Sequence, residues 1–459
     1  MSGRRRRTGR TPTRRVAARP TRAATRPHGV RLPSRAPSAR TGTAAADLAA
    51  AIRAKTTKRI IGLISGTSAD GITAALVEIT DRLPAGRGRA TGRRAPTEGA
   101  GHDHPKVRLV AHTTVPYPPE VRRRVIDVFT QPATTQEIAS LHYLLGESFA
   151  DAALAAAKRA GCPMTRVDLI ASHGQTVAHV GVPDPSDPWS RAATMQLGES
   201  AVIAERTRRP VLADFRAADI AAGGQAAPFV PYADIVLLSA PHGRIALNLG
   251  GISNITVLPA SGRRDDVYAF DCGPANMLID GLVRHFSGGA ETFDRDGARA
   301  ARGTVREDLL RELLAHPFVN APPPKTAGHE QFGRPFLDGL LATWGRLPAD
   351  DLIATATAFA GDAVGRNVAR YVVPRHAIAD LVAAGGGVHN PALMHRLARA
   401  VAPIRVRRID EFGVPADAKE ALAFALLGHA TLMGIPGNLP RVTGARHAAI
   451  LGKWTWPPR

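Results

Sequence analysis

The sequence lacks any uninterrupted run of the roughly 18 to 20 apolar residues that a membrane-spanning helix needs. Cysteine is nearly absent, and the two present, Cys162 and Cys272, exclude a disulfide framework and a zinc site built from cysteines. The rest of the composition, with 44% hydrophobic and 22% charged residues, is typical of a globular protein. A length of 459 residues predicts about two to three domains.

Acidic residues are almost absent from the first 58 positions, where 16 Lys and Arg accompany a single acid, Asp47. The other 401 residues carry a net charge of only +6 out of the total of +21. Residues 1–43 consist mostly of Arg, Pro, Thr, Ala, Ser and Gly, which offer too little apolar surface to offset the entropy lost on folding. We therefore expect residues 1–58 to form a disordered, Arg-rich tail.

Three interpretations of this tail are open. Its arginines are suited to neutralising the phosphates of a nucleic acid, but the tail lacks aromatic residues for base stacking, and no nucleic-acid-binding motif follows it. A secretory signal requires an apolar segment of about 7 to 15 residues, and the best candidate, residues 44–52, is interrupted by Asp47. We favour the third interpretation, an inert extension that results from a start codon placed too far upstream.

Strand patterns alternate with helix patterns from residue 59 onwards. Short apolar runs predict strands at residues 60–65, 74–79, 107–115, 167–172, 210–215, 244–259 (two strands around a turn), 267–271 and 381–384. Helices are expected at residues 133–161, where apolar residues recur at three- and four-residue spacing, and at 275–286, 391–401 and 417–433. Residues 84–106 are turn-rich and predict an exposed inserted loop. The alternation predicts an α/β fold.

Three glycine-rich turns follow apolar strands: Gly66-Thr67-Ser68-Ala69-Asp70-Gly71, Gly250-Gly251 and Gly385-Gly386-Gly387. Glycine lets backbone N–H groups approach a phosphate closely, and the hydroxyls of the first turn add donors. None matches the P-loop or the dinucleotide fingerprint, and each alone is more often a tight turn than a nucleotide site. Three together, with Asp70 and Asp271 nearby to hold Mg²⁺, predict a nucleotide site.

The first of these turns resembles the opening phosphate loop of the anhydro-N-acetylmuramic acid kinases. The likeness extends in order over residues 59–452, and this many ordered blocks make it highly specific. The blocks are IGLISGTSADG (61–71), SHGQTVAH (172–179), MQLGESAVIAERT (195–207), ADFRAADIAAGGQAAPFVP (213–231), LNLGGISNIT (247–256), FDCGPANMLID (270–280), PPPKTAGHEQF (322–332), AAGGGVHNPALM (383–394), KEALAFALLGH (419–429) and GIPGNLPRVTGA (434–445).

The resemblance implies a two-domain α/β fold of the sugar kinase/Hsp70/actin class with a cleft between the domains. We expect a first lobe at residues 59–240 and a second at residues 241–459. In the implied reaction, ATP with Mg²⁺ phosphorylates O6 of 1,6-anhydro-N-acetylmuramate while water opens the anhydro bridge at C1. The product is N-acetylmuramate 6-phosphate, an intermediate of cell-wall recycling. The resemblance also implies a cytoplasmic homodimer with no membrane and no specific nucleic-acid partner.

The resemblance assigns the sugar chemistry to two carboxylates. Asp214, in the motif Asp-Phe-Arg, matches the family's catalytic base. Glu420, at the start of a helix, matches the family's sugar-binding glutamate. By position alone, Asp214 fits equally well as a cap or turn residue, and Glu420 fits as a favourable acid in a first helical turn.

Three further residues are expected around the sugar. His173 and Gln175 follow a strand end and are expected to line the sugar pocket, although a lone histidine at a strand end is usually a satisfied polar residue. Arg216 is expected either to bind the lactyl carboxylate of the sugar or to form an ion pair with Asp214 or Asp219.

The implied ATP site spans all three turns, with the adenosine near the third, and its Mg²⁺ is expected on Asp70 and Asp271. The ATP-binding residues are expected to be Gly66, Thr67, Ser68, Ala69, Asp70, Gly71, Ile72, Thr73, Gly250, Gly251, Asn276, Gly385, Gly386, Gly387 and Asn390. The sequence departs from the usual family pattern at Ala69, Thr73, Cys272, Ala275 and Thr326-Ala327. None of these departures removes a carboxylate assigned to the sugar chemistry.

Two rival functions are weighed against this one. The first is a kinase of the same superfamily that acts on a different sugar. The second is a non-catalytic protein that senses a sugar or ATP and binds nucleic acid through its basic tail. The presence of both Asp214 and Glu420, and the absence of a winged-helix pattern before residue 59, speak against the second.

Overall fold

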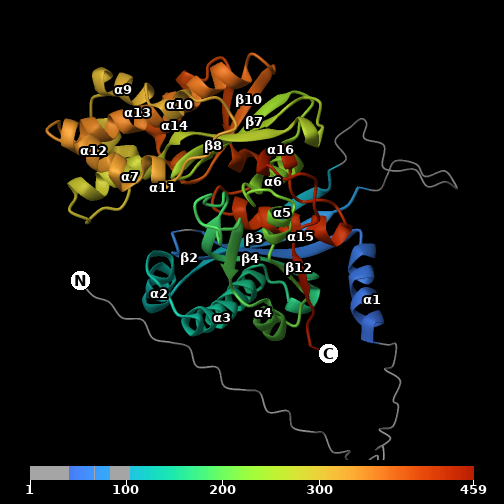
Figure 1. Cartoon of the computed structure of the whole chain (residues 1–459). Helices are drawn as coiled ribbons and strands as arrows, with labels where there is room; N and C mark the ends of the chain where they lie inside the picture. Colours follow the sequence, from blue (N-terminus) through green and yellow to red (C-terminus); the bar gives the residue numbers. More distant parts are fainter. Residues whose placement is uncertain (1–40, 67, 83–103, 459) are drawn as a thin grey trace, which may run out of the picture. The chain divides into compact units, whose positions relative to one another are not determined.

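Two β-sheets organise the computed structural model, which describes residues 41–66, 68–82 and 104–458 (Figure 1). The first sheet has the spatial order β12 (Lys453–Thr455), β6 (Val211–Ala213), β4 (Leu169–Val180), β1 (Thr57–Ser65), β2 (Gly71–Thr80) and β3 (Lys106–Pro116), with β5 (Ala193–Leu197) paired to β4. The second has the order β11 (Arg405–Arg408), β10 (Ile378–Ala384), β7 (Gly243–Leu249), β8 (Ile252–Leu258) and β9 (Tyr268–Pro274).

Helices are interspersed with these strands along the chain. They are α1 (Thr41–Ala54), α2 (Pro119–Thr130), α3 (Thr135–Arg159), α4 (Ser200–Thr207), α5 (Ala217–Ala221), α6 (Val230–Leu238), α7 (Asn276–Phe286), α8 (Ala298–Arg302), α9 (Glu307–Leu314), α10 (Pro317–Asn320), α11 (His329–Phe332), α12 (Arg334–Trp344), α13 (Ala349–Asn367), α14 (Pro391–Ala400), α15 (Lys419–Met433) and α16 (Pro440–Thr443). The expected α/β class is confirmed, as are the helices expected at residues 133–161, 275–286, 391–401 and 417–433.

The central strand β1 of the first sheet is buried on both faces, and its side chains point alternately to the two sides. Ile61 and Leu63 pack with Phe149 of α3, whereas Ile60 packs with Leu427 of α15. Figure 1 shows α3 on one side of this sheet and α15 on the other. Gly62 permits the close approach of α15, since a Cβ atom there would lie 1.9 Å from the carbonyl oxygen of Ala421.

Helix α15 also belongs to the core of the second sheet. Its Leu422 lies in one hydrophobic cluster with Ile60 of β1 and with Ala246 and Val382 of the second sheet. The opposite face of the second sheet packs against α13 and α14. The segment 241–459 therefore supplies the whole second sheet, and it also supplies α15 and β12 to the first.

Residues 41–58, expected to belong to a disordered tail, are folded instead: α1 spans Thr41–Ala54 and β1 begins at Thr57. Ile52 is buried at 4% exposure, and the Arg53 guanidinium donates to the carbonyl oxygen of Leu432 at 2.8 Å. Lys55 forms an ion pair with Asp168. The Ala-rich segment 44–54 thus packs on the body of the protein through Ile52, which its composition does not indicate. Residues 1–40, and nearly all of the loop expected at 84–106, lie outside the described residues.

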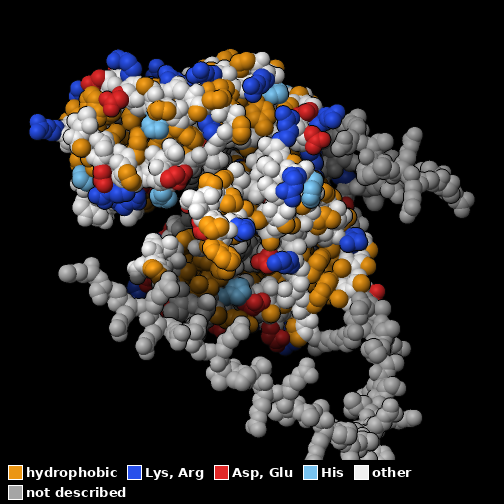
Figure 2. Space-filling view, viewed as in Figure 1, with side chains coloured by type: hydrophobic (Ala, Val, Ile, Leu, Met, Phe, Trp, Pro, Cys, Tyr) orange, Lys and Arg blue, Asp and Glu red, His pale blue; other side chains and the backbone are white. Residues whose placement is uncertain are grey.

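The described surface is mixed in charge. On the face drawn in Figure 2, Lys and Arg side chains are interspersed with Asp and Glu and do not gather in one basic patch. Residues 47–459 form one compact unit. Within the described part of the chain, no helix is both long enough and apolar enough to cross a membrane.

Candidate active site

The first glycine-rich turn joins β1 to β2, and its two glycines have different surroundings. A Cβ atom on Gly71 would lie 2.4 Å from the carbonyl oxygen of Val115, so the pairing of β2 with β3 requires glycine there. A Cβ atom on Gly66 would meet no atom within 4 Å. The packing of the described chain therefore does not explain Gly66, whereas the approach of a ligand to its backbone would. Thr67 lies outside the described residues.

The other two turns meet at the ends of β7 and β10. The N-terminus of α7 is bonded to the Gly250-Gly251 turn, because the amide of Asn276 donates to the carbonyl oxygen of Gly250 at 3.0 Å. Gly385 has a left-handed backbone (φ 86°), and a Cβ atom there would lie 2.6 Å from Oδ1 of Asn248. Glycine is thus needed where the third turn passes the end of β7.

A pocket of about 860 Å³, here called the loop pocket, collects residues from the first and third turns. Ser68 and Asp70 line it from the first turn, and Asn276, Gly386 and Asn390 line it from the second-sheet side. The Asn390 side chain also caps α14 by accepting the amide of Leu393 at 3.1 Å. Five expected ATP residues thus border one cavity.

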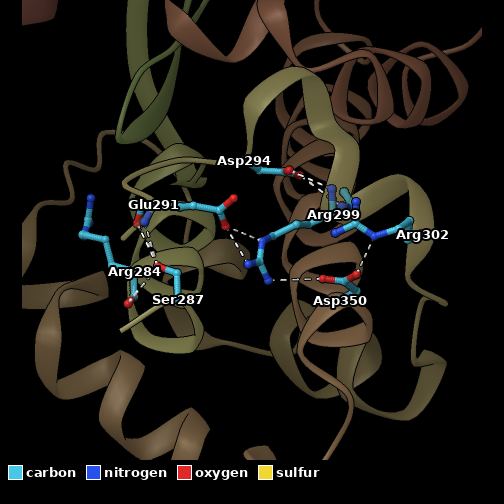
Figure 3. Close-up of polar contacts among 8 residues, drawn as sticks. Arg284, Ser287, Glu291, Asp294, Arg299, Arg302 and Asp350 are labelled. Atoms are coloured by element: carbon cyan, nitrogen blue, oxygen red, sulfur yellow. Dashed lines mark hydrogen bonds and ion pairs between the residues drawn. The ribbon is translucent and has the colours of Figure 1, made fainter. Parts of the chain in front are cut away.

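One wall of the loop pocket is a segment, Phe293–Asp296, that the sequence did not indicate. Figure 3 shows the contacts that hold it: the Asp294 carboxylate accepts the amide of Arg299 at 2.8 Å, and Arg299 lies 2.6 Å from Glu291 and 3.4 Å from Asp350. Arg299 and Asp350 are 51 positions apart in sequence, so no local pattern marks their contact. The wall is fixed by charge pairs that only the folded chain brings together.

A second pocket of about 440 Å³, here called the arginine pocket, contains Arg216, Glu420, Asn248 and Gly250. It shares Gly386 with the loop pocket, so the two cavities adjoin. The Glu420 side chain is exposed to this pocket, and desolvation by the protein around the pocket raises the pKa of its carboxyl. Burial likewise lowers the pKa of Arg216 to about 10, which the negative charge of Glu420 partly opposes.

Arg216 is held in place by His173. The Arg216 Nε donates to Nε2 of His173 at 2.9 Å, and Nδ1 of His173 bonds the carbonyl oxygen of Gly174 at 2.9 Å. Burial, together with the positive charge of Arg216, lowers the pKa of His173 to about 3, so the ring is neutral and accepts from the arginine. Arg216 also donates to the carbonyl oxygen of Ala226 and lies over the ring of Phe229.

The alternative ion pair of Arg216 with Asp214 or Asp219 does not form among the described residues. Asp219 is fully buried and accepts from the amide of Ala226 and from the hydroxyl of Thr443, both at 2.7 Å. Its carboxylate is thereby occupied with holding the chain after α5. The Arg216 guanidinium is left with its outer edge in the arginine pocket.

Gln175 lies deeper than expected. It is fully buried, and its side chain accepts the hydroxyl of Ser65 at 2.5 Å and donates to the carbonyl oxygen of Gly66 at 3.2 Å. None of the pockets described above is lined by its side chain. Gln175 lies within β4, which extends to Val180, and its side chain ties this strand to the start of the first turn.

Asp214 follows β6 with a left-handed backbone (φ 56°), a conformation that is strained for a residue with a side chain. Its Oδ2 lies 2.9 Å from Nζ of Lys453, which β12 places opposite Ala213. Lys453 was not predictable from the sequence, because 239 positions separate it from Asp214. The Asp214 carboxylate is 45% exposed and borders a third, small polar cavity.

The two expected Mg²⁺ ligands lie in different settings. Asp70 borders the loop pocket, with its carboxylate 3.0 Å from Arg122. Asp271 accepts the amide of Ala327 at 2.7 Å, and its burial raises the pKa of this carboxyl to about 6. The described residues contain no group of three or more His, Cys, Asp and Glu that could hold a metal ion. Mg²⁺ commonly takes one or two protein carboxylates and draws its other ligands from phosphate and water.

Comparison with known proteins agrees with the motifs. A sequence model of the anhydro-N-acetylmuramic acid kinase family matches residues 58–457. The anhydro-N-acetylmuramic acid kinases of Caldanaerobacter subterraneus and Salinibacter ruber are each 41% identical to this chain, over 87% and 90% of it and over 97% and 99% of their own lengths. That of Clostridioides difficile is 37% identical over 87% of this chain and 98% of its own. The chain therefore belongs to the anhydro-N-acetylmuramic acid kinase family.

Proposed function

We propose that the protein transfers the γ-phosphoryl group of ATP to O6 of 1,6-anhydro-N-acetylmuramate while water opens the anhydro bridge at C1. The observation that carries this proposal is the junction of the two pockets at Gly386. One cavity is bordered by glycine-rich turns suited to phosphates, and the adjoining one presents an arginine and a glutamate suited to a sugar acid. A phosphoryl group passing between the two ligands would travel a short path past this glycine.

ATP occupies the loop pocket in this proposal. The backbone of Gly66–Thr73, with the hydroxyls of Thr67 and Ser68, binds the phosphates, and Gly250-Gly251 closes over them. Gly385–Gly387, Asn276 and Asn390 contact the nucleoside. The open space beside Gly66 supports the phosphate placement. Asp70 and Asp271 are the residues proposed to hold Mg²⁺, whose charge, when bound, neutralises the phosphate oxygens.

The sugar occupies the arginine pocket. Arg216 binds the lactyl carboxylate through the edge of its guanidinium that faces the cavity, since a planar fork of donors matches a carboxylate. Neutral His173 accepts from Nε and so fixes the orientation of this fork. His173 is thereby proposed as a support for Arg216 instead of a direct sugar ligand. Glu420 binds sugar hydroxyls from the opposite wall.

Asp214 is proposed as the general base. Its carboxylate takes a proton from water while the water oxygen bonds to C1 and the bond from C1 to the bridging oxygen breaks. The released electron pair remains on O6, which attacks the γ-phosphorus as ADP leaves. The contact of Asp214 with Lys453 supports this role, because it holds the carboxylate at the border of the small polar cavity.

The test is incubation of the full chain with ATP, Mg²⁺ and 1,6-anhydro-N-acetylmuramate, followed by mass spectrometry for the 6-phosphate. In ¹⁸O-labelled water the label is expected at C1, because the bridging oxygen leaves with the phosphate on O6. Product without label at C1 contradicts the coupled hydrolysis. An ADP-release screen over other sugars tests the rival sugar kinase, and light scattering after size-exclusion chromatography tests the proposed homodimer.

A further inference from the structure

The small polar cavity beside Asp214, here called the Ser172 cavity, has a volume of about 80 Å³. Ser172 lies in its wall, opposite Leu63 of β1 and just before a register shift in the β1–β4 pairing, and is 1% exposed. The Ser172 hydroxyl has no hydrogen-bond partner among the described residues. Buried hydroxyls are almost always paired, either with protein or with ordered water. A water molecule in the adjoining cavity would supply the missing partner.

Other polar groups of the same wall are already bonded within the protein. Nδ1 of His142 accepts the amide of Gly198 at 3.0 Å, so the ring proton is on Nε2 and is donated to Glu199 at 3.1 Å. Glu199 in turn accepts the amide of Ala201 at the start of α4 at 2.7 Å. These bonds hold the wall in one shape. Ser172 and Asp214 are therefore the groups best placed to bind a small molecule inside the Ser172 cavity.

We propose that the Ser172 cavity holds the water that is consumed in the reaction, with Ser172 as its positioning residue and Asp214 as the base that activates it. This inference rests on the proposed function. A polar cavity of this volume has room for more than one water molecule, and several donors and acceptors line it. His173 borders the cavity and is bonded to Arg216 of the arginine pocket, so this pair links the cavity to the proposed sugar site.

Water, the sugar and ATP account for every bond made and broken in the hydrolysis step. One water oxygen bonds to C1, its proton passes to Asp214, and the electron pair of the broken C1–oxygen bond forms the new bond from O6 to phosphorus. The cavity then refills with water. Because the chamber is small and polar, it favours water over a larger alcohol as the nucleophile.

Methanol competition tests this selectivity. The full chain and its Ser172→Ala variant are each supplied with ATP, Mg²⁺ and sugar in dilute aqueous methanol, and the free sugar 6-phosphate and its methyl glycoside are quantified by mass spectrometry. Wild type is expected to form less methyl glycoside than the methanol-to-water ratio of the solution predicts. Ser172→Ala loses the hydroxyl and enlarges the cavity, so it is expected to form several-fold more methyl glycoside than wild type.

In plain buffer, Ser172→Ala is also expected to lower kcat by about 2- to 10-fold, the loss of one hydrogen bond, with KM for both substrates nearly unchanged. The matched control is Thr357→Val, which removes a buried hydroxyl that is bonded to the carbonyl oxygen of Ile353 at 2.8 Å in α13. Its product ratio and kcat are expected to equal those of wild type.

A Ser172→Ala protein with the product ratio and kcat of the control overturns the proposal. A wild-type product ratio equal to that of the bulk solvent overturns it as well, and this arm needs no variant. Failure of the proposed function is distinguishable from both, because in that case wild type forms no sugar 6-phosphate in water alone. Thermal unfolding of the variant adds a third measurement: a midpoint several degrees higher means that the hydroxyl had no water partner, which also overturns the proposal.

Discussion

Asp214 carries the sharpest expectation at the scale of single residues. Asparagine tolerates a left-handed backbone and matches the shape of aspartate, so Asp214→Asn is expected to fold normally. It cannot accept the proton from water, and kcat is therefore expected to fall by about 10²-fold or more. Steady-state kinetics measures the loss, and calorimetry with a non-hydrolysable ATP analogue is expected to show unchanged nucleotide affinity. Near-normal turnover would remove Asp214 from its proposed role.

His173 gives a pH-dependent expectation. Its pKa in the folded chain is lowered to about 3, from an ordinary value of 6.5, chiefly by burial. Between these two values the unfolded chain binds a proton that the folded chain does not, so stability rises with pH and is lost as pH falls from about 6.5 towards 3. His173→Gln retains an acceptor for Arg216 without a titrating ring. Its thermal midpoint is expected to fall less steeply over this interval, and curves parallel to wild type would contradict the assignment.

From the sequence, residues of one motif are expected to lie in one site. Asp214 and Arg216 stand two positions apart, and the structure turns them to different cavities, one towards Lys453 and the other towards His173. The function of His173 as an acceptor for arginine was not predictable, because it depends on how β4 and the segment after β6 meet. Burial of Gln175 was missed for the same reason: an amide at a strand end looks the same in sequence whether it faces a pocket or a backbone.

At the scale of elements, the first turn can be tested without disturbing the fold. Gly66→Val places a branched side chain in the open space beside the turn, where a phosphate is proposed to lie. We expect the affinity for an ATP analogue to fall at least 10-fold, about 1.4 kcal/mol, while sugar binding changes little. Gly339→Val is the control, because that glycine has equally open surroundings on α12. Unchanged affinity for the analogue in calorimetry would place the phosphates elsewhere.

Most elements were predictable because their signals are local. The helix at Thr135–Arg159 repeats its apolar residues with helical spacing, and the strand pair around Gly250-Gly251 is marked by its turn. The partner of each element was not predictable. Nothing in residues 419–433 indicates that this helix packs against both sheets, and α1 escaped because Ile52 is a single apolar anchor in an Ala-rich segment.

At the scale of the whole molecule, the N-terminal region divides at α1. Removal of residues 1–40 deletes 13 arginines and no acid, and we expect it to abolish salt-sensitive binding to polyanions while activity and thermal midpoint are kept. Removal of residues 1–56 also deletes Ile52 and the contacts of Arg53 and Lys55 with the body. That shorter chain is expected to unfold several degrees lower.

Differential scanning calorimetry and heparin binding over a salt series measure both effects. Equal midpoints for the two truncated chains would mean that α1 contributes nothing to the fold. A several-fold loss of turnover on removal of residues 1–40 alone would assign the tail to the enzyme and end its interpretation as an inert extension.

The order in which the chain leaves the ribosome has a consequence for the first sheet. Its strands β1 to β6 emerge early, but the helix that covers one face and the strand that pairs with β6 are made more than 200 residues later. Until then, the edge beside Asp214 is a bare row of backbone donors and acceptors, open to pairing with another chain. Nascent copies stalled before Lys419 would therefore aggregate through β6, the strand that precedes Asp214, and chaperone demand should peak in that interval of synthesis.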